Sequence, residues 1–336
     1  MSRFEIFGRS WRLRVAFVVF LCTFALSALA SPGEEAPAAR SFLNEGLALF
    51  QAHRYAEAVD WFGRALQQDP SDADAELLSG RALWELKRPL EAIDHLRHSV
   101  ELRPAGLPAQ IHLCKAYWEL ERFGEAATAC RRAAETASTS STAFAFDTAG
   151  SAFFRLGRFE EAWEMFRRAT DVNPNATTYY NLSRTQAAMG QLEEAVESIR
   201  TAIRLQPDFD DARISLGFYS IALRSYRESI ATFKQVLVGN PSDERAHLGI
   251  AIAEKYLGHV DKAITAASKA VTIRPCFAFA RYILGILQFE SGDTRSALVA
   301  QETLRSLDPA LAEEYSRYLR GRYVVQADGP SNEGSR

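Results

Sequence analysis

The feature of this sequence that most limits its fold is a repeat of about 34 residues. Prolines mark the period, and the intervals between successive members of the series are 34, 70, 33, 34, 34 and 34 residues. The interval of 70 indicates that one proline is missing near Ser138. A period of this length is typical of stacked structural repeats, in which each unit packs on its neighbours. The prolines of the series are Pro70, Pro104, Pro174, Pro207, Pro241, Pro275 and Pro309.

Small residues recur in phase with these prolines. When each proline is placed at position 32 of its unit, positions 8, 20 and 27 hold mostly Gly, Ala, Ser or Cys, and position 24 holds mostly large apolar residues. Small side chains allow two helix axes to approach closely. Position 15 is glycine in four units, which is the residue expected just past the end of a helix. Each unit is therefore predicted to be a helix, a short turn, a second helix and a turn.

This pattern resembles the tetratricopeptide repeat, whose signature is a small residue at positions 8, 20 and 27, an aromatic or aliphatic residue at position 24, and proline at position 32. The resemblance extends from Ala39 to Pro309 and implies an all-α, right-handed superhelical solenoid of about eight helix pairs with a C-terminal capping helix. The fourth unit matches the signature most fully, at Gly150, Phe153, Ala162, Phe166, Ala169 and Pro174.

The repeat register divides the whole chain into predicted segments. Ser141 and Thr142 are read as an insertion before the fourth unit, within a polar linker that begins at Ser138. The segments are a signal peptide over 1–30, a linker over 31–38, repeats over 39–72, 73–106, 107–140, 143–175, 176–209, 210–243, 244–277 and 278–309, a capping helix over 310–325 and a disordered tail over 326–336.

The N-terminal thirty residues have the composition of a secretory signal. Four arginines between Arg3 and Arg14 precede an uncharged stretch of sixteen residues, from Val15 to Ala30, which ends in a small-x-small pattern. That stretch is shorter than the ~20 residues that span a bilayer. We expect cleavage after Ala30 and export to the periplasm, the cell envelope or the medium. The alternative is an uncleaved anchor, the only membrane attachment that the sequence offers.

Composition and motifs argue against several classes of function. Without residues 1–30 the chain carries 35 basic and 41 acidic side chains, a net charge of −6, which does not suit a nucleic-acid partner. No serine lies in a nucleophile-elbow pattern, and His95 and His98 share a helix face but lack a third metal ligand nearby. We therefore expect no enzyme activity and no cofactor, and predict a non-catalytic scaffold that binds a protein or peptide.

The resemblance also implies where such a partner binds. In this family, positions 2, 5, 9, 12 and 13 of the first helices line a concave groove. Position 12 supplies an aromatic row and position 9 a basic row, which suit a ligand with apolar anchors and acidic or carboxylate groups. It stays open whether the two tryptophans belong to the groove or to the core, and a glycan-binding or glycan-processing role is the alternative. The predicted groove residues are Leu77, Arg81, Trp84, Ile111, Lys115, Trp118, Phe154, Tyr180 and Arg184.

Two cysteines occupy matching places in the third unit. Cys114 is at position 8 and Cys130 at position 24, which lie at equal height on antiparallel helices and face one another. An oxidising compartment would allow a disulfide between them. Buried free thiols are the alternative, because an unpaired cysteine behaves as a small hydrophobic residue.

The predicted cleavage can be tested by sequencing the N-terminus of the exported protein. We expect the first residue to be Ser31, because Ala28 and Ala30 supply the small side chains that a signal peptidase requires. An intact Met1 on a membrane-bound form would contradict this prediction.

Overall fold

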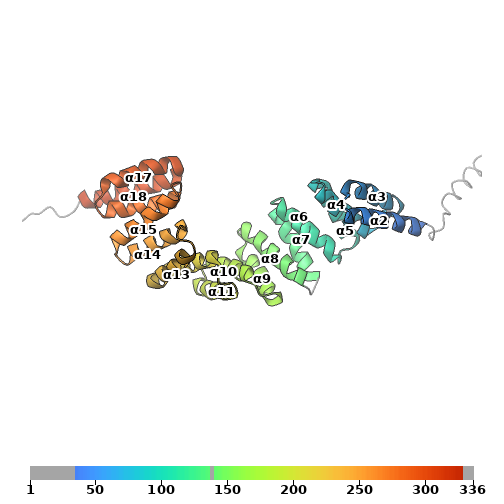
Figure 1. Cartoon of the computed structure of the whole chain (residues 1–336), viewed down its shortest axis with the longest axis horizontal. Coiled ribbons are helices and arrows are strands. Elements are labelled where there is room, and N and C mark those ends of the chain that lie inside the picture. Colours follow the sequence, from blue (N-terminus) through green and yellow to red (C-terminus); the bar gives the residue numbers. More distant parts are fainter. Residues whose placement is uncertain (1–34, 137–139, 328–336) are drawn as a thin grey trace, which may run out of the picture. The chain divides into compact units, whose positions relative to one another are not determined.

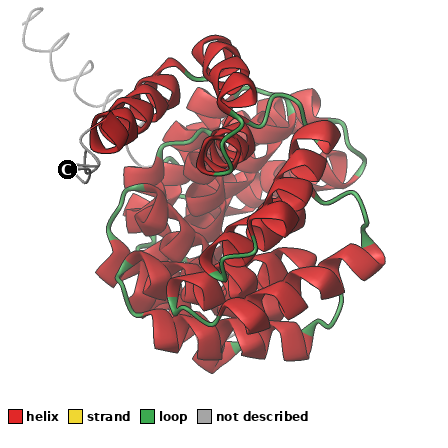
Figure 2. Cartoon of the chain, turned by 90° about the vertical axis from the view of Figure 1, so that its left-hand side faces the viewer, coloured by secondary structure: helices red, strands yellow, loops and turns green. Residues whose placement is uncertain are grey.

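The computed structural model describes residues 35–136 and 140–327, and within these ranges every regular element is an α-helix (Figure 2). The helices alternate along the chain as the first and second helices of eight repeats, and α18 (Pro309–Ala327) follows them (Figure 1). The predicted all-α array of helix pairs is thus confirmed. The first and second helices of the repeats are α2 (Glu35–Gln51) and α3 (Tyr55–Gln68), α4 (Ala73–Glu85) and α5 (Pro89–Leu102), α6 (Leu107–Glu119) and α7 (Phe123–Thr136), α8 (Ser140–Arg155) and α9 (Phe159–Val172), α10 (Ala176–Ala188) and α11 (Leu192–Leu205), α12 (Asp210–Ala222) and α13 (Tyr226–Gly239), α14 (Glu244–Tyr256) and α15 (Val260–Ile273), and α16 (Ala278–Glu290) and α17 (Thr294–Leu307).

The chain divides into two compact units, an N-terminal unit that ends at Ala152 and a C-terminal unit that begins at Phe153. In both units the helices whose contacts the structure describes pack mainly on the helices next to them in the chain, as a repeat array requires.

Close approach between small residues and large rings explains the small-residue positions. Phe233 in α13 is fully buried, and a Cβ atom added to Gly217 of α12 would lie 2.5 Å from its ring. A Cβ atom added to Gly249 of the following α14 would lie 2.2 Å from the same ring. One aromatic side chain is therefore held between the first helices of two successive repeats, and any side chain at either glycine would displace it.

The turn between the two helices of a repeat uses the left-handed conformation in all eight repeats. Glycine occupies this place in four of them, with φ values from 71° to 92°. The other four have non-glycine residues with φ values from 56° to 61°, where the Cβ atom is disfavoured. In chain order these residues are His53, Lys87, Glu121, Gly157, Gly190, Arg224, Gly258 and Gly292.

The third repeat is crosslinked. Cys114 in α6 and Cys130 in α7 form a disulfide, with their Cα atoms 4.8 Å apart, and both side chains are fully buried. The sequence left a disulfide and two buried free thiols open as alternatives, and the structure contains the disulfide. Positions 8 and 24 hold a glycine and a large apolar residue in several other repeats, as in Gly46 against Phe62. The disulfide takes the place of that contact.

Three predicted boundaries were wrong. Helix α2 (Glu35–Gln51) includes residues 35–38, so these are not a linker. Helix α8 (Ser140–Arg155) includes Ser141 and Thr142, so the two inserted residues lengthen this helix instead of forming a loop, since no proline stops it. Helix α18 (Pro309–Ala327) includes residues 326 and 327, which were predicted to belong to the tail. The predicted signal peptide and Ser138 lie outside the described residues.

Two glycine substitutions with opposite expected effects on the free energy of unfolding test the role of the turn. A Cβ atom at Gly157 or Gly63 would meet no atom within 4 Å, so backbone conformation alone decides the outcome. Gly157→Ala should lower the free energy of unfolding by about 1 kcal/mol, because φ is positive there. Gly63→Ala, inside α3, should raise it by about 0.5–1 kcal/mol. Urea denaturation measures both, and a shift in the same direction would contradict this account.

The disulfide is tested by Cys114→Ala and by reduction. Because the crosslink closes a loop of about 15 residues, either change should lower the free energy of unfolding by roughly 3 kcal/mol. Cys276 is exposed and free, so Cys276→Ala is the matched control and should leave the urea midpoint unchanged. The unfolded, unreduced chain from Ser31 onward should show one reactive thiol, and three would disprove the crosslink.

Candidate functional site

First helices of the N-terminal unit surround a small cavity, here called the first-helix pocket. Its volume is about 130 Å³. It brings together three of the predicted groove residues, Arg81 and Trp84 from α4 and Lys115 from α6. Phe50 from α2 and His112 from α6 complete its aromatic and basic lining, and Glu85 supplies one carboxylate.

Cations cover aromatic faces along this surface. The guanidinium carbon of Arg81 lies 4.9 Å from the centre of the Phe50 ring, which is within the range of a cation–π interaction. The Phe50 ring in turn meets Tyr55 edge-on, with 5.3 Å between the ring centres. A position 9 side chain thus covers the position 12 ring of the preceding repeat.

The two tryptophans are partly buried, so they serve packing and surface together. Trp118 meets Phe123, the first residue of α7, edge-on, with 5.3 Å between the ring centres. Trp84 keeps part of its surface accessible and lines the first-helix pocket. Neither side chain is wholly a core residue, and both can contact a ligand.

His112 lies among positive charges in the first-helix pocket. Burial, together with the charges of Arg81 and Lys115, lowers the pKa of His112 to about 4. At neutral pH this imidazole is therefore uncharged, while Arg81 and Lys115 carry positive charge. The Lys115 ammonium lies 3.7 Å from Glu119 in an exposed pair, which contributes little by itself. The sequence pattern assigned no role to His112 and missed it as a pocket residue, although it follows the predicted Ile111 directly.

The C-terminal unit holds a related cluster. The guanidinium carbon of Arg184 lies 4.9 Å from the ring centre of Phe154 and 5.5 Å from that of Tyr180. Phe154 meets Phe159 edge-on at 5.4 Å, and Tyr180 packs against Phe209 at 5.1 Å. The predicted groove residues Phe154, Tyr180 and Arg184 therefore lie together.

The remaining predicted groove residues, Leu77 and Ile111, are partly buried on α4 and α6 and do not line the first-helix pocket. Leu77 lies one helical turn before Arg81 on α4, and Ile111 lies one turn before Lys115 on α6. Each therefore lies on the same side of its helix as the basic residue that follows it.

His95 and His98 have a structural role. Both imidazoles contact the buried carboxylate of Glu76 through Nδ1, at 2.5 Å for His95 and 2.7 Å for His98. A carboxylate buried between two helices needs such hydrogen bonds. In the part of the chain that the structure describes, no three His, Cys, Asp or Glu side chains are arranged to hold a metal ion. Over residues 35–136 and 140–327, no helix has both the length and the apolar character to cross a bilayer.

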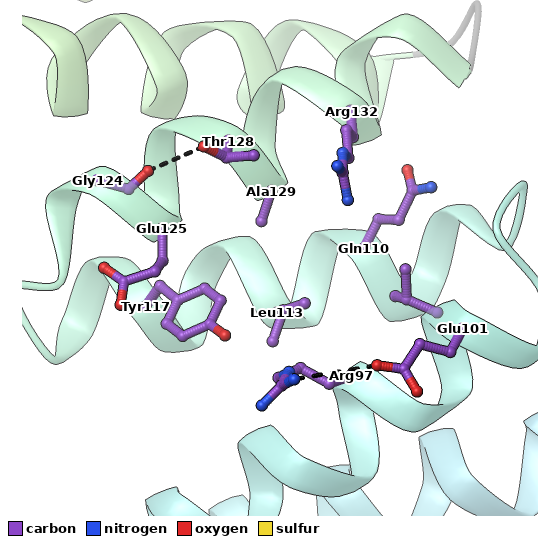
Figure 3. A pocket seen from close by; sticks show the side chains of 11 residues that line it. Arg97, Glu101, Gln110, Leu113, Tyr117, Gly124, Glu125, Thr128, Ala129 and Arg132 are labelled. Atoms are coloured by element: carbon purple, nitrogen blue, oxygen red, sulfur yellow. Dashed lines mark hydrogen bonds and ion pairs between the residues drawn. The ribbon is translucent and has the colours of Figure 1, made fainter.

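A larger hollow lies between second helices of the same N-terminal unit (Figure 3). This second-helix groove has a volume of about 590 Å³, with walls from α5 and α7 and a floor from α6. Sequence analysis pointed to no residue here. The available signal was the run of small residues on one face of α7, at Gly124, Thr128 and Ala129.

Comparison with known proteins gives the chain its family. The profile described as tetratricopeptide repeat matches residues 27–73, 43–106, 148–209 and 180–244, just over half of the chain. Over 107 residues the chain is 31% identical to the Hsp70-Hsp90 organizing protein of Triticum aestivum, a match covering 32% of this chain and 18% of that protein. Over 95 residues it is 30% identical to DnaJ homolog subfamily C member 3 of Homo sapiens, covering 28% of this chain and 19% of that protein. The chain thus spans less than a fifth of the length of these two relatives.

Similar solved structures include MamA of Desulfovibrio magneticus RS-1, with a TM-score of 0.45 and 20% identity over 50% of this chain and 96% of that chain. YrrB, described as a TPR protein with an unusual peptide-binding site, has a TM-score of 0.40 and 18% identity over 65% of this chain and 95% of that chain. With the family profile matched in phase with helix pairs along the described residues, the chain belongs to the tetratricopeptide-repeat family.

Proposed function

We propose that this protein is an exported, non-catalytic scaffold that docks an acidic segment of a partner protein at its first-helix pocket. The observation that carries the proposal is the convergence of Arg81, His112 and Lys115 with the Phe50 and Trp84 rings around one cavity. Its family membership and its similarity to the Hsp70-Hsp90 organizing protein support protein binding as the general activity. Export rests on the N-terminal sequence pattern.

The charges in the pocket favour a carboxylate. Arg81 and Lys115 supply fixed positive charge, and burial beside them lowers the pKa of His112 to about 4, so that His112 stays neutral even in mildly acidic solution. A carboxylate placed in the pocket would receive charge-assisted hydrogen bonds, which are stronger than neutral ones. Next to these groups, Trp84 and Phe50 give an apolar side chain of the partner a surface to cover.

The same geometry makes a glycan a weaker candidate. Sugar rings stack on uncovered aromatic faces, but Arg81 lies over Phe50 and Arg184 lies over both Phe154 and Tyr180. A peptide needs no such free face, because its carboxylates can contact the arginines that cover the rings.

Binding of a fluorescein-labelled, amidated peptide of alternating Leu and Asp tests the proposal. Lys115→Gln or Arg81→Gln should weaken its affinity by about fivefold to tenfold, which is about 1–1.4 kcal/mol. Trp84→Ala should cost about 2 kcal/mol or more if this ring is a binding hot spot. Arg131→Gln is the control, because Arg131 is an exposed basic residue of α7 outside the pocket. If all four variants bind the peptide as tightly as the unmodified protein does, docking at the first-helix pocket is disproved.

The affinity should also depend on pH through His112. The free pocket has a His112 pKa of about 4. A bound carboxylate favours the protonated imidazole, so the pKa is higher in the complex and binding takes up a proton. Affinity should therefore rise as the pH falls from 7.5 to 5, a range in which the Asp side chains of the peptide stay ionised. His112→Gln should abolish this rise, and a flat profile for the unmodified protein would show that no carboxylate reaches His112.

A further inference from the structure

We infer that the second-helix groove between α5 and α7 is a separate docking site for an extended peptide segment in which an Asp or Glu side chain adjoins an apolar one. The inference goes beyond the proposed function, which concerns the first-helix pocket. It rests on three observations: a tyrosine hydroxyl without a protein partner that faces the groove, an arginine without an ion-pair partner, and an apolar floor between them.

The hydroxyl belongs to Tyr117. Only 7% of this residue is exposed, and within the described residues its hydroxyl makes no hydrogen bond to another protein group and stays accessible in the groove. Figure 3 shows the ring at one end of the groove, with the hydroxyl directed toward Leu113 and Arg97. Burial raises the pKa of Tyr117 above its ordinary value. The hydroxyl is protonated at neutral pH and is free to donate a hydrogen bond to a ligand carbonyl.

The charges around the groove leave one cation unmatched. On one wall Arg97 lies 4.0 Å from Glu101, and on the other Glu125 accepts from Arg122 at 2.6 Å. Arg132 has no carboxylate within ion-pair distance in the described part of the chain. The charge left over is therefore positive, and the complementary ligand group is an anion.

The two polar groups are placed for an extended ligand. In Figure 3, Tyr117 lies at one end of the groove and Arg132 at the other, with Leu113 and Ala129 between them. Gln110 is not available to a ligand, because its amide nitrogen donates to the Pro104 carbonyl and its oxygen accepts from Thr136. An extended segment can place a backbone carbonyl at Tyr117, an apolar side chain over Leu113, and a carboxylate at Arg132.

The groove is pre-formed and independent of the first-helix pocket. Leu113 and Ala129 are the chain neighbours of Cys114 and Cys130, so the disulfide fixes the floor of the groove to one wall. Pre-formed sites lose less ordering free energy on binding. On α6, the groove residues 110, 113 and 117 lie about 100° or more around the helix from pocket residue 112. Both surfaces can therefore be occupied at once.

The test uses the chain from Ser31 onward with Arg81→Gln and Lys115→Gln, which disable the first-helix pocket. The probe is a fluorescein-labelled, acetylated and amidated hexapeptide, Leu-Gly-Leu-Glu-Leu-Gly, and its matched form has Gln in place of Glu. We expect the Glu probe to bind at least fivefold more tightly than the Gln probe in fluorescence anisotropy. Arg132→Gln should remove that difference, and Tyr117→Phe should weaken both probes threefold or more. Arg131→Gln, one residue away on α7, is the matched control and should change neither.

Several results would overturn the assignment. No binding in the pocket-disabled chain would show that the groove takes no peptide, whatever happens at the first-helix pocket. Equal binding of the Glu and Gln probes would remove Arg132 as the anion contact. Self-association in analytical ultracentrifugation that is lost in Arg132→Gln would show that a second copy of the chain, and not a peptide, covers the groove. If the Glu probe binds normally here but the first-helix variants change nothing in the unmodified protein, this site stands and the proposed function falls.

Discussion

Contact between a small residue of the first helix and a large side chain of the second sets the spacing of the helix pairs. Phe233 shows this most clearly, because its ring reaches both Gly217 of its own repeat and Gly249 of the next. The ring therefore fixes the distance within a pair and the distance between pairs together. The positions of Arg81, Trp84 and Lys115 on successive first helices follow from this spacing, since a wider one would separate them.

The repeat register made the fold predictable from sequence. Prolines, glycines and alanines recur in phase, so helix pairs, turns and the facing pair Cys114 and Cys130 could all be placed by counting. The ends of the array were less predictable. Residues 35–38, 141–142 and 326–327 are helical although they lie outside the predicted repeats and capping helix, because the repeat period contains no information about residues outside its units.

The candidate site was predictable only in part. Counting positions selected Arg81, Trp84 and Lys115, but it could not show that a partly buried histidine lines the same pocket and feels both charges. The second-helix groove was not predictable at all. Its floor and walls come from three helices, and the missing partner of Tyr117 is a property of packing that no spacing in the sequence records.

The disulfide also bears on cooperativity. In a linear array, neighbouring repeats stabilise one another through their interfaces. When an inner repeat unfolds, the repeats on its two sides therefore no longer stabilise each other. The third repeat contributes α6 to both the first-helix pocket and the second-helix groove. Its two helices are joined by a covalent bond at the place where the first repeat has only the Phe62 ring packed on Gly46. Oxidised, this repeat joins its neighbours in one folding unit. When the disulfide is reduced, two thiols occupy the space that a ring would fill in another repeat. The first two repeats can then unfold as a separate block, with the third repeat as the boundary.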